Sequence, residues 1–427
     1  MPWGVGFDAQ AVNRLANLLG LEPIHVSQVS SLRTSSRPRS RNPYHFTGEV
    51  LADKFRGRTR EIEIARSCLN QDPSTPVALV GLQRTGKSSL ASEIIRQMQK
   101  KDKQLRVISY VLGDFEEGGE CADIAGFLLK SIPDKDAIAS ILGSLRKLKL
   151  KRSVGLEREL FRDALKHLKN KTSRPTILFL DELHKLDQRS AGSGHSTFPD
   201  FLENIAKDKS LGLRLMVGAR PIMLTQTESI KRVNLMKLFR PITVASVDEN
   251  AATQIVNLGQ PTFLFEPDAI QRILNLSGRN PYWIQLLCFE AFLHYQGNGQ
   301  TGKVTVQAIN SIFQELLRGG ASRSYFEAQY LDVIPLGPPM KLLDQVARLA
   351  SNEGSRVPYP KLLGITNNNS DSLNRDLRPL LDYEILSKHS DSDPVTVSFI
   401  SEGLRLHLRY DRNLQLGQPL DLNRSQH

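Results

Sequence analysis

The stretch VALVGLQRTGKSSLASEII at residues 77–95 decides the fold. Four apolar residues run into Gly81, a short polar loop ends in Gly86, Lys87 and Ser88, and an amphipathic segment follows. A buried strand, a glycine-containing loop and a helix form the setting in which the pattern G-x-x-x-x-G-K-[ST] binds a phosphate chain. The glycines let backbone N–H groups point at phosphate oxygens, and the helix N-terminus adds partial positive charge. This stretch therefore predicts a nucleotide-phosphate site.

Each polar residue of the loop has an expected role. The Lys87 ammonium should reach the β and γ phosphates, and the Ser88 hydroxyl should bind Mg²⁺. We therefore expect ATP and Mg²⁺ as cofactors. The residues expected to contact the nucleotide here are Gly81, Arg84, Thr85, Gly86, Lys87, Ser88 and Ser89.

A second motif, TILFLDELHKL at residues 176–186, supplies two carboxylates. Its apolar run ends in Asp181, which we expect to hold Mg²⁺ through water, and Glu182 is placed to orient or deprotonate an attacking water. Asp181, Glu182 and Lys87 are thus the expected catalytic residues of a hydrolysis reaction. The alternative is that the two carboxylates only cap the helix that follows.

The other apolar runs indicate the fold class. Runs that are apolar at every position fit strands buried on both faces, and their alternation with helices indicates a parallel sheet of α/β type. The spacing between the two motifs leaves room for one further strand, an arrangement typical of AAA+-like P-loop ATPases. Beyond residue 248 helices dominate up to about 318. The expected strands are 77–81, 105–113, 176–181, 213–219 and 241–247, with helices at 86–99 and within 120–170.

Further segments resemble, in order, motifs of the STAND class of AAA+-related ATPases, which are signal-transduction switches common in bacteria. The resemblance runs from about residue 44 to about 410. NPYHFTGEVLADKFRGRTREIEIA at 42–65 is similar to a hydrophobic-Gly-Arg motif that lies near the adenine, which implies an adenine-side role for Arg58. Thr59 stands where the family usually has a glutamate.

Two more segments carry this resemblance. LRLMVGARP at 213–221 resembles the fourth strand and its sensor, which places Arg220 where it would respond to the γ-phosphate. LSGRNPYWIQLLC at 276–288 resembles the Gly-x-Pro motif of a helical lid, whose Pro281 would pack against the nucleotide, although Arg279 occupies the usual glycine position. The alternatives are a surface salt bridge for Arg220 and a helix start for Pro281.

Arg240 precedes the fifth apolar run. Hexameric AAA+ ATPases carry a finger at about this place, which reaches into the neighbouring subunit's site. STAND proteins usually lack that finger, so a structural role for Arg240 is the alternative. The resemblance also implies protein partners, acting as effector or sensor, and an ATP-dependent homo-oligomer.

Residues 340–410 carry three helical segments, the last at 370–386, followed by the polar turn SKHSDSDP and the strand VTVSF. Three helices and a β-wing predict a winged helix, which the resemblance also implies here. The third helix mixes acidic and basic residues and is interrupted by Pro379, whereas a helix that reads the major groove presents a clearer basic face. In STAND proteins this domain folds back on the nucleotide domain. His389 and His407 are candidate phosphate sensors or structural residues.

The expected architecture is α/β, with a three-layer parallel-sheet P-loop domain of AAA+ type followed by a helical lid and a winged helix. The expected segments are a short helix (8–24) with a basic Ser/Arg/Pro linker at 1–43, the ATPase domain at 44–247, the lid at 248–320, a linker at 321–339, the winged helix at 340–410 and a tail at 411–427.

Charge and cysteine content narrow the function classes. The net charge of +11 is concentrated at 146–174, which fits either a solvated helical face or contact with a nucleic-acid backbone. Cys68, Cys121 and Cys288 lack Cys-x-x-Cys spacing, which argues against a disulfide framework and against a zinc site. No apolar run approaches the roughly 20 residues that span a bilayer, and the N-terminus lacks a signal core. We therefore expect a cytoplasmic protein.

These patterns favour an ATP-binding switch that hydrolyses ATP slowly, with a bacterial defence or signalling system as its candidate setting. Two alternatives stay open. One is a DNA-engaging ATPase similar to origin-recognition or transposon target-selection ATPases, which would use 146–174 and the winged helix. The other is a nucleotide-gated scaffold that binds ATP without turnover.

Overall fold

The computed structural model describes eleven stretches of the chain. The chain divides into two units, Met1–Asn42 and Pro43–His427, and the second holds every element discussed. The expected helix at 8–24, residues 146–152 of the basic stretch and Cys121 lie outside the described residues. The described stretches are 42–50, 52–112, 124–132, 153–172, 175–186, 198–221, 236–297, 302–318, 326, 338–366 and 369–413.

A five-stranded sheet forms the centre of the first half, with every strand pair parallel. Its strand order is β2-β3-β4-β1-β5, so that β4 separates the two strands that carry the motifs. The further strand expected between the two motifs in sequence is β2, at the edge of the sheet, and its presence is confirmed. The strands are β1 (Val77–Val80), β2 (Arg106–Val111), β3 (Thr176–Asp181), β4 (Leu213–Ala219) and β5 (Arg240–Thr243).

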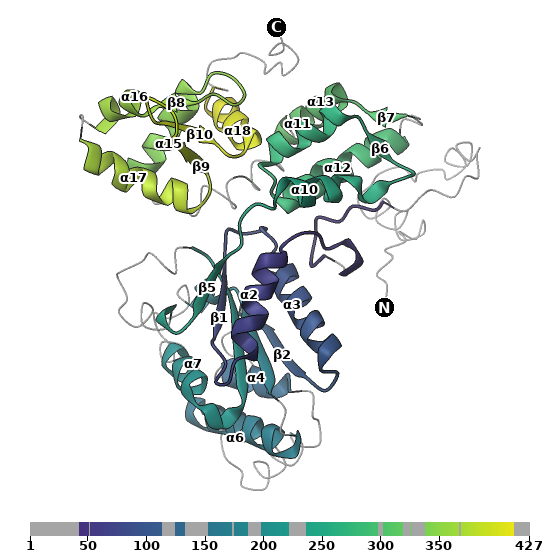
Figure 1. Ribbon diagram of the computed structural model, residues 1–427, viewed down its shortest axis with the longest axis vertical. Helices are drawn as coiled ribbons and strands as arrows, with labels where there is room; N and C mark the ends of the chain where they lie inside the picture. The colour runs from purple at the N-terminus through teal and green to yellow at the C-terminus, as the bar shows by residue number, and fades with distance from the viewer. Residues whose placement is uncertain are drawn as a thin grey trace, which may run out of the picture. The chain divides into compact units, whose positions relative to one another are not determined.

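Helices cover both faces of this sheet (Figure 1). Side chains alternate between the faces of a strand, so Val77 and Leu79 pack with α2 and α3, while Ala78 and Val80 pack into the core that holds α4, α6 and α7. The parallel-sheet α/β P-loop fold expected from the sequence is confirmed. The helices are α2 (Thr59–Asn70), α3 (Lys87–Lys101), α4 (Ile124–Lys130), α6 (Val154–Thr172) and α7 (Phe198–Lys207), with short 3₁₀ turns η3 (Ala52–Lys54), η5 (Leu183–Leu186) and η7 (Lys209–Leu211).

Residues 249–318, called the helical region below, follow β5. Asp248 caps its first helix by accepting a hydrogen bond of 2.8 Å from the Ala251 N–H. The region also contains a two-residue parallel pair, β6 (Leu264–Phe265) with β7 (Lys303–Val304), where no strand was expected. The helices are α10 (Glu249–Val256), η8 (Asn257–Gly259), α11 (Pro267–Ser277), α12 (Pro281–Gly297) and α13 (Val306–Arg318).

Residues 338–413, the C-terminal region, hold three helices, a three-stranded antiparallel sheet of order β8-β10-β9, and a closing helix. Four details differ from expectation, the first being that β8 was not expected. Helix α17 runs through Pro379 and ends at Asp382, β9 occupies the first half of the expected polar turn, and α18 was not expected. The elements are α15 (Pro338–Leu349), β8 (Val357–Pro358), α16 (Tyr359–Leu363), η10 (Gly364–Thr366), α17 (Ser370–Asp382), β9 (Leu386–His389), β10 (Thr396–Phe399) and α18 (Glu402–Asn413).

The early end of α17 has a local cause. Glu384 has φ of 53°, a left-handed conformation that breaks the helical path, and the Ile385 N–H returns to the Leu380 carbonyl. This N–H to carbonyl return resembles the way helices close at a left-handed residue. The chain leaves the helix at Tyr383 and enters β9 three residues later.

The helical region and the C-terminal region share one apolar core, which also includes Tyr44 and Leu82. Between them, the Ser401 hydroxyl donates to the Leu276 carbonyl at 2.8 Å. A ring stack also joins them, with Trp283 on Phe326 at 4.2 Å between centroids and Phe326 on His407 at 4.9 Å. Pulling the two regions apart would expose buried apolar side chains at roughly 1.5–3 kcal/mol each. The two regions therefore form one body.

The described cysteines and helices test the expectations about disulfides and membrane spans. Cys288 is buried in α12 and Cys68 is half-buried in α2, and neither forms a disulfide. None of the described helices is long and apolar enough to cross a membrane.

Candidate functional site

The loop from Gly81 to Gly86 curls around the Lys87 side chain. It starts at the carboxyl end of β1, where the Gly81 N–H donates to the Ala219 carbonyl of β4 at 3.2 Å. It ends at Gly86, whose φ of 93° only glycine adopts without strain. The Lys87 ammonium is buried and donates to the Gly81 carbonyl at 3.1 Å and the Leu82 carbonyl at 2.8 Å. The Thr85 hydroxyl also donates to Leu82, at 2.9 Å.

The two sequence motifs meet at Ser88. Its hydroxyl donates to Asp181 Oδ2 at 2.5 Å, and Asp181 Oδ1 accepts the Glu182 N–H at 2.8 Å. A hydroxyl and a buried carboxylate provide the hard oxygen donors that Mg²⁺ prefers. The residues present therefore fit a magnesium ion held between α3 and the end of β3.

Gly218 makes this meeting possible. Asp181 lies at the end of β3, and its carboxylate has to reach over the neighbouring β4 to meet Ser88 at the start of α3. A Cβ at Gly218 would lie only 2.1 Å from Asp181 Oδ1. The missing side chain at Gly218 is therefore the gap through which the carboxylate passes.

Charges concentrate around the loop. Burial lowers the pKa of Lys87, the carboxylates of Glu182 and Asp181 oppose that shift, and the Arg220 guanidinium adds to it. Arg220 also donates to Gln83 Oε1 at 3.2 Å, and its Nε is buried with no acceptor among the described residues. A half-buried cation with a buried N–H that lacks an acceptor, beside a phosphate loop, suits an anionic ligand.

Glu182 is held from three directions. Its N–H donates to Asp181, its carbonyl accepts the Lys185 N–H at 2.8 Å, and its Oε2 lies 3.1 Å from His184 Nε2. Its φ of 58° is left-handed, a conformation that a non-glycine residue keeps only when its surroundings impose it. Burial by itself raises the pKa of Glu182, but the His184 contact and the charges of Lys87 and Lys185 bring it down to about 2. The carboxylate is thus ionised at neutral pH.

Arg58 is hydrogen-bonded to the backbone of the loop. Its guanidinium is buried and donates to the Thr85 carbonyl at 3.3 Å and to the Ala245 carbonyl after β5. It also pairs with Glu61 at 3.1 Å. Burial lowers the pKa of Arg58, and the carboxylates of Glu61, Glu384 and Asp248 oppose that shift. In this structure Arg58 ties the phosphate loop to the segment that leads into the helical region.

The start of α12 also reaches the loop. Arg84 donates to the Tyr282 hydroxyl at 2.7 Å, and its guanidinium carbon lies 4.5 Å from the Tyr282 ring centroid. Pro281 is the first residue of α12, and its Cγ lies 4.0 Å from where a Cβ on Gly86 would be. The expected lid proline therefore lies beside the phosphate loop. Ser89, in the first turn of α3, accepts the Val50 N–H at 3.1 Å through its hydroxyl.

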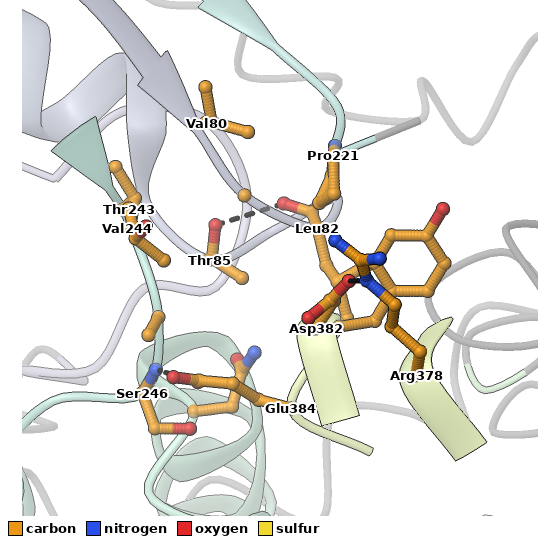
Figure 2. Close-up of a pocket in the computed structure, with 14 residues that line it drawn as sticks. Val80, Leu82, Thr85, Pro221, Thr243, Val244, Ser246, Arg378, Asp382 and Glu384 are labelled. Atoms are coloured by element: carbon orange, nitrogen blue, oxygen red, sulfur yellow. Dashed lines mark hydrogen bonds and ion pairs between the residues drawn. The ribbon is translucent and has the colours of Figure 1, made fainter. Parts of the chain in front are cut away.

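A cavity of about 330 Å³ adjoins the first half of the loop (Figure 2). The loop and the end of β5 form one wall, and the end of α17 forms the other. Figure 2 shows the Glu384 carboxylate directed at Ser246, whose N–H it accepts at 3.1 Å. Arg378 and Asp382 form an ion pair at 3.5 Å on the same wall. The cavity is lined by Val80, Gly81, Leu82, Thr85, Pro221, Thr243, Val244, Ala245, Ser246, Asn280, Arg378, Asp382, Tyr383 and Glu384.

Three other candidates lie away from this cavity. Arg240 pairs with Val77 at the amino end of its strand, so it is exposed at the sheet edge opposite the loop. His389 Nε2 lies 2.8 Å from the Ser398 hydroxyl in the C-terminal sheet. His407 is buried in the shared core, where it stacks on Phe326.

Residues 54–205 match the family model of the AAA ATPase domain. The chain carries an AAA ATPase domain over this stretch.

Solved structures support the same fold. A Walker-type ATPase of Pyrococcus abyssi superposes with a TM-score of 0.53 at 16% identity, over 86% of this chain and 99% of that one. The ORC2 protein of Aeropyrum pernix, solved as ADPNP and ADP complexes, gives 0.52 at 11% identity, over 87% of this chain and 98% of that one. At these identities the likeness concerns the fold alone. No curated protein is similar enough in sequence to count as a relative.

Five residues at the site were not predicted from the sequence, and one of them is Gly218, whose role depends on the strand order. Gln83 and His184 lie inside the two motifs. Their polar side chains, at positions that the motifs leave open, could have indicated a role at the site. Tyr282 follows the expected Pro281 directly. Glu384 had no local signal, because only the packing of the C-terminal region brings it to Ser246.

The replacement Gly218→Ala should displace the Asp181 carboxylate from Ser88, because the new methyl group would occupy its path. We expect Mg²⁺-dependent ATP binding, measured by calorimetry, to weaken by at least about tenfold, the equivalent of ~1.4 kcal/mol. Gly155→Ala in α6 is the matched control, because a Cβ there meets no atom within 4 Å. Unchanged Mg²⁺-ATP affinity in Gly218→Ala would contradict the role given to Gly218.

Proposed function

We propose that this protein is an ATP-binding switch of the STAND type that hydrolyses ATP slowly. In this proposal residues 249–318 are a lid, residues 338–413 are a winged helix, and both respond to the nucleotide held at the Gly81–Ser88 loop. Partner proteins that act as effector or sensor read the response. The proposal rests on the AAA ATPase domain, on the meeting of Ser88 with Asp181, and above all on the cavity that joins the loop to the C-terminal region.

The site offers each chemical role that ATP hydrolysis needs. In our proposal Lys87 and Arg220 neutralise the phosphate oxygens, and Ser88 and Asp181 hold Mg²⁺, which when bound would polarise the phosphate oxygens. Glu182, ionised at neutral pH, accepts a proton from the attacking water. Pro281 and Arg84 close the loop against α12.

A short chain of contacts supports the coupling between nucleotide and C-terminal region. Thr85 in the loop is bonded to Arg58, Arg58 is bonded to Ala245, and the next residue, Ser246, donates to Glu384. The Glu384 charge also acts on the Arg58 guanidinium. A ligand that moves the Thr85 backbone therefore changes the contacts that hold Glu384. Differential contact of this kind is what lets a ligand shift a conformational equilibrium.

Lys87→Ala tests nucleotide binding. We expect the variant to lose the rise in melting temperature that ATP causes, because only a ligand that binds the native state stabilises it, by ~2.7 kcal/mol at a hundred times Kd. Stability without nucleotide should change by about 1 kcal/mol or less, since relief from burying a cation offsets the lost hydrogen bonds. Lys101→Ala, exposed at the end of α3, is the control. A full ATP-induced shift in Lys87→Ala would refute the phosphate-site assignment.

Glu384→Ala tests the coupling. Removing a negative charge that lines the cavity beside the phosphate loop should raise ATP affinity about threefold to tenfold, or ~1 kcal/mol, with a smaller gain for ADP. Loss of the bond to Ser246 should at the same time speed amide hydrogen exchange in residues 380–386. Asp391→Ala, exposed in the turn of the same region, is the control and should change neither quantity. Wild-type affinity and exchange in Glu384→Ala would rule out this path of coupling.

A DNA-engaging ATPase is the second candidate. Arg375 on α17 favours it, because its side chain is 75% exposed on the third helix of the C-terminal region. Two observations weigh against it. Arg378 on the same helix is 80% exposed but pairs with Asp382 at 3.5 Å beside the cavity, and Arg158 and Arg162 of the basic stretch pack over the Phe201 ring at 5.3 and 5.8 Å. We therefore favour the switch.

Binding to duplex DNA distinguishes the switch from the DNA-engaging ATPase. We expect binding weaker than micromolar at physiological salt in a fluorescence anisotropy titration. A DNA-engaging protein would instead bind in the micromolar range or tighter, with an affinity that falls steeply with salt. Charge reversal in the basic stretch would then weaken binding equally for all sequences and leave ATP binding intact. The reversed residues are Lys147, Lys149, Lys151 and Arg152.

A further inference from the structure

His184 is the buried neighbour of Glu182. It lies in the turn η5 directly after β3, its side chain is 7% exposed, and its Nε2 is 3.1 Å from Glu182 Oε2. Its other ring nitrogen, Nδ1, is buried and has no hydrogen-bond partner among the described residues. The ring therefore makes one polar contact there, and that contact is with Glu182.

The two ring nitrogens fix the tautomer. If Nδ1 carried the proton, a buried N–H would lack an acceptor, and Nε2 would face the carboxylate with a lone pair. With the proton on Nε2, the ring donates to Glu182, and Nδ1 leaves only a lone pair unmatched. In the Nε2–H tautomer the only free-energy cost is an Nδ1 lone pair without a donor. In the Nδ1–H tautomer the cost is higher, because a buried N–H lacks an acceptor and the Nε2 lone pair is repelled by the carboxylate. The geometry thus favours an Nε2–H donor toward Glu182.

The contact leaves one oxygen of Glu182 available. Among the described residues nothing donates to Oε1, and the Glu182 side chain keeps 20% of its surface exposed. The backbone of Glu182 is already fixed through Asp181 and Lys185. His184 therefore removes the remaining freedom, the rotation of the carboxylate, and decides which oxygen meets water.

We propose that His184 is a positioning residue for hydrolysis, which pins Glu182 Oε2 so that Oε1 receives the proton of the attacking water. This rests on the proposed function. In the reaction the water oxygen bonds to the γ-phosphorus, the bond from that phosphorus to the ADP oxygen breaks, and the water proton passes to Oε1. His184 touches neither water nor phosphate and acts through Glu182 alone.

The first test separates turnover from binding. His184→Leu should lower kcat about ten- to hundredfold, the range seen when a group that orients a catalytic side chain is lost. KM for ATP and the ATP-induced rise in melting temperature should stay within about twofold of wild type. His184→Gln, whose amide can donate in place of Nε2–H, should recover some of the lost turnover. His167→Gln, exposed on α6, is the control and should have wild-type turnover.

A double-mutant cycle identifies the route of the effect. Because His184 acts through the Glu182 carboxylate, His184→Leu added to Glu182→Gln should cause no further loss of kcat. An additional loss in the Glu182→Gln background, or wild-type kcat in His184→Leu, would overturn the role of His184. Wild-type turnover in Glu182→Gln, or no turnover by the unmodified protein, would instead overturn the hydrolysis in the proposed function, and the positioning role with it.

The tautomer gives a readout that is independent of activity. In protein labelled with ¹⁵N-histidine, the resonance that disappears in His184→Leu belongs to His184. Its long-range proton–nitrogen correlations should show the Nε2–H form in the wild type, and the same form in the Lys87→Ala variant that does not bind ATP. An Nδ1–H form would overturn the proposed contact, whatever the kinetic result.

Discussion

The path of the Asp181 carboxylate across β4 is the constraint on which the site depends. Strands in a sheet lie about 4.8 Å apart, so the ends of β3 and β1 are separated by about 10 Å. The Asp181 carboxylate reaches over β4, and Ser88 at the start of α3 meets it there, only because β4 presents Gly218 at the crossing point. The parallel register brings the carboxyl ends of all three strands to one edge, and it places Gly218 of β4 beside Asp181 of β3. The loop, the carboxylates and Arg220 all lie at that edge.

The site extends beyond the sheet through polar contacts. The Arg58 guanidinium donates hydrogen bonds to the carbonyls of Thr85 and Ala245. The Glu384 carboxylate accepts a hydrogen bond from the N–H of the next residue, Ser246. Each is a single hydrogen bond or charge pair, and such contacts contribute about 0.5–3 kcal/mol. A nucleotide can rearrange interactions of this size. The Arg58 guanidinium is therefore suited to pass a change in the loop to the rest of the molecule.

The sequence predicted those features of the site whose chemistry is local. Lys87, Ser88 and Asp181 belong to motifs in which a strand, a loop and a helix follow one another, and the structure brings these three together as expected. Gly218 and Glu384 could not be predicted, because their importance arises from strand order and domain packing. The early end of α17 depends on one left-handed residue, Glu384, and residue patterns do not reveal that conformation.

The distribution of apolar packing limits which movements the proposed switch could make. The helical and C-terminal regions share a continuous core, with a ring stack from Trp283 to His407, whereas polar contacts and the Leu82 side chain join them to the phosphate loop and to the segment after β5. In the proposed switch, differential binding of ATP and ADP would supply a coupling energy of about 1–3 kcal/mol. That energy can break the Glu384 contact but cannot expose a core in which each large side chain contributes 1.5–3 kcal/mol or so. A nucleotide-driven change in this chain should therefore turn both regions together about the segment 244–248, because separating them from each other would cost more than the nucleotide supplies.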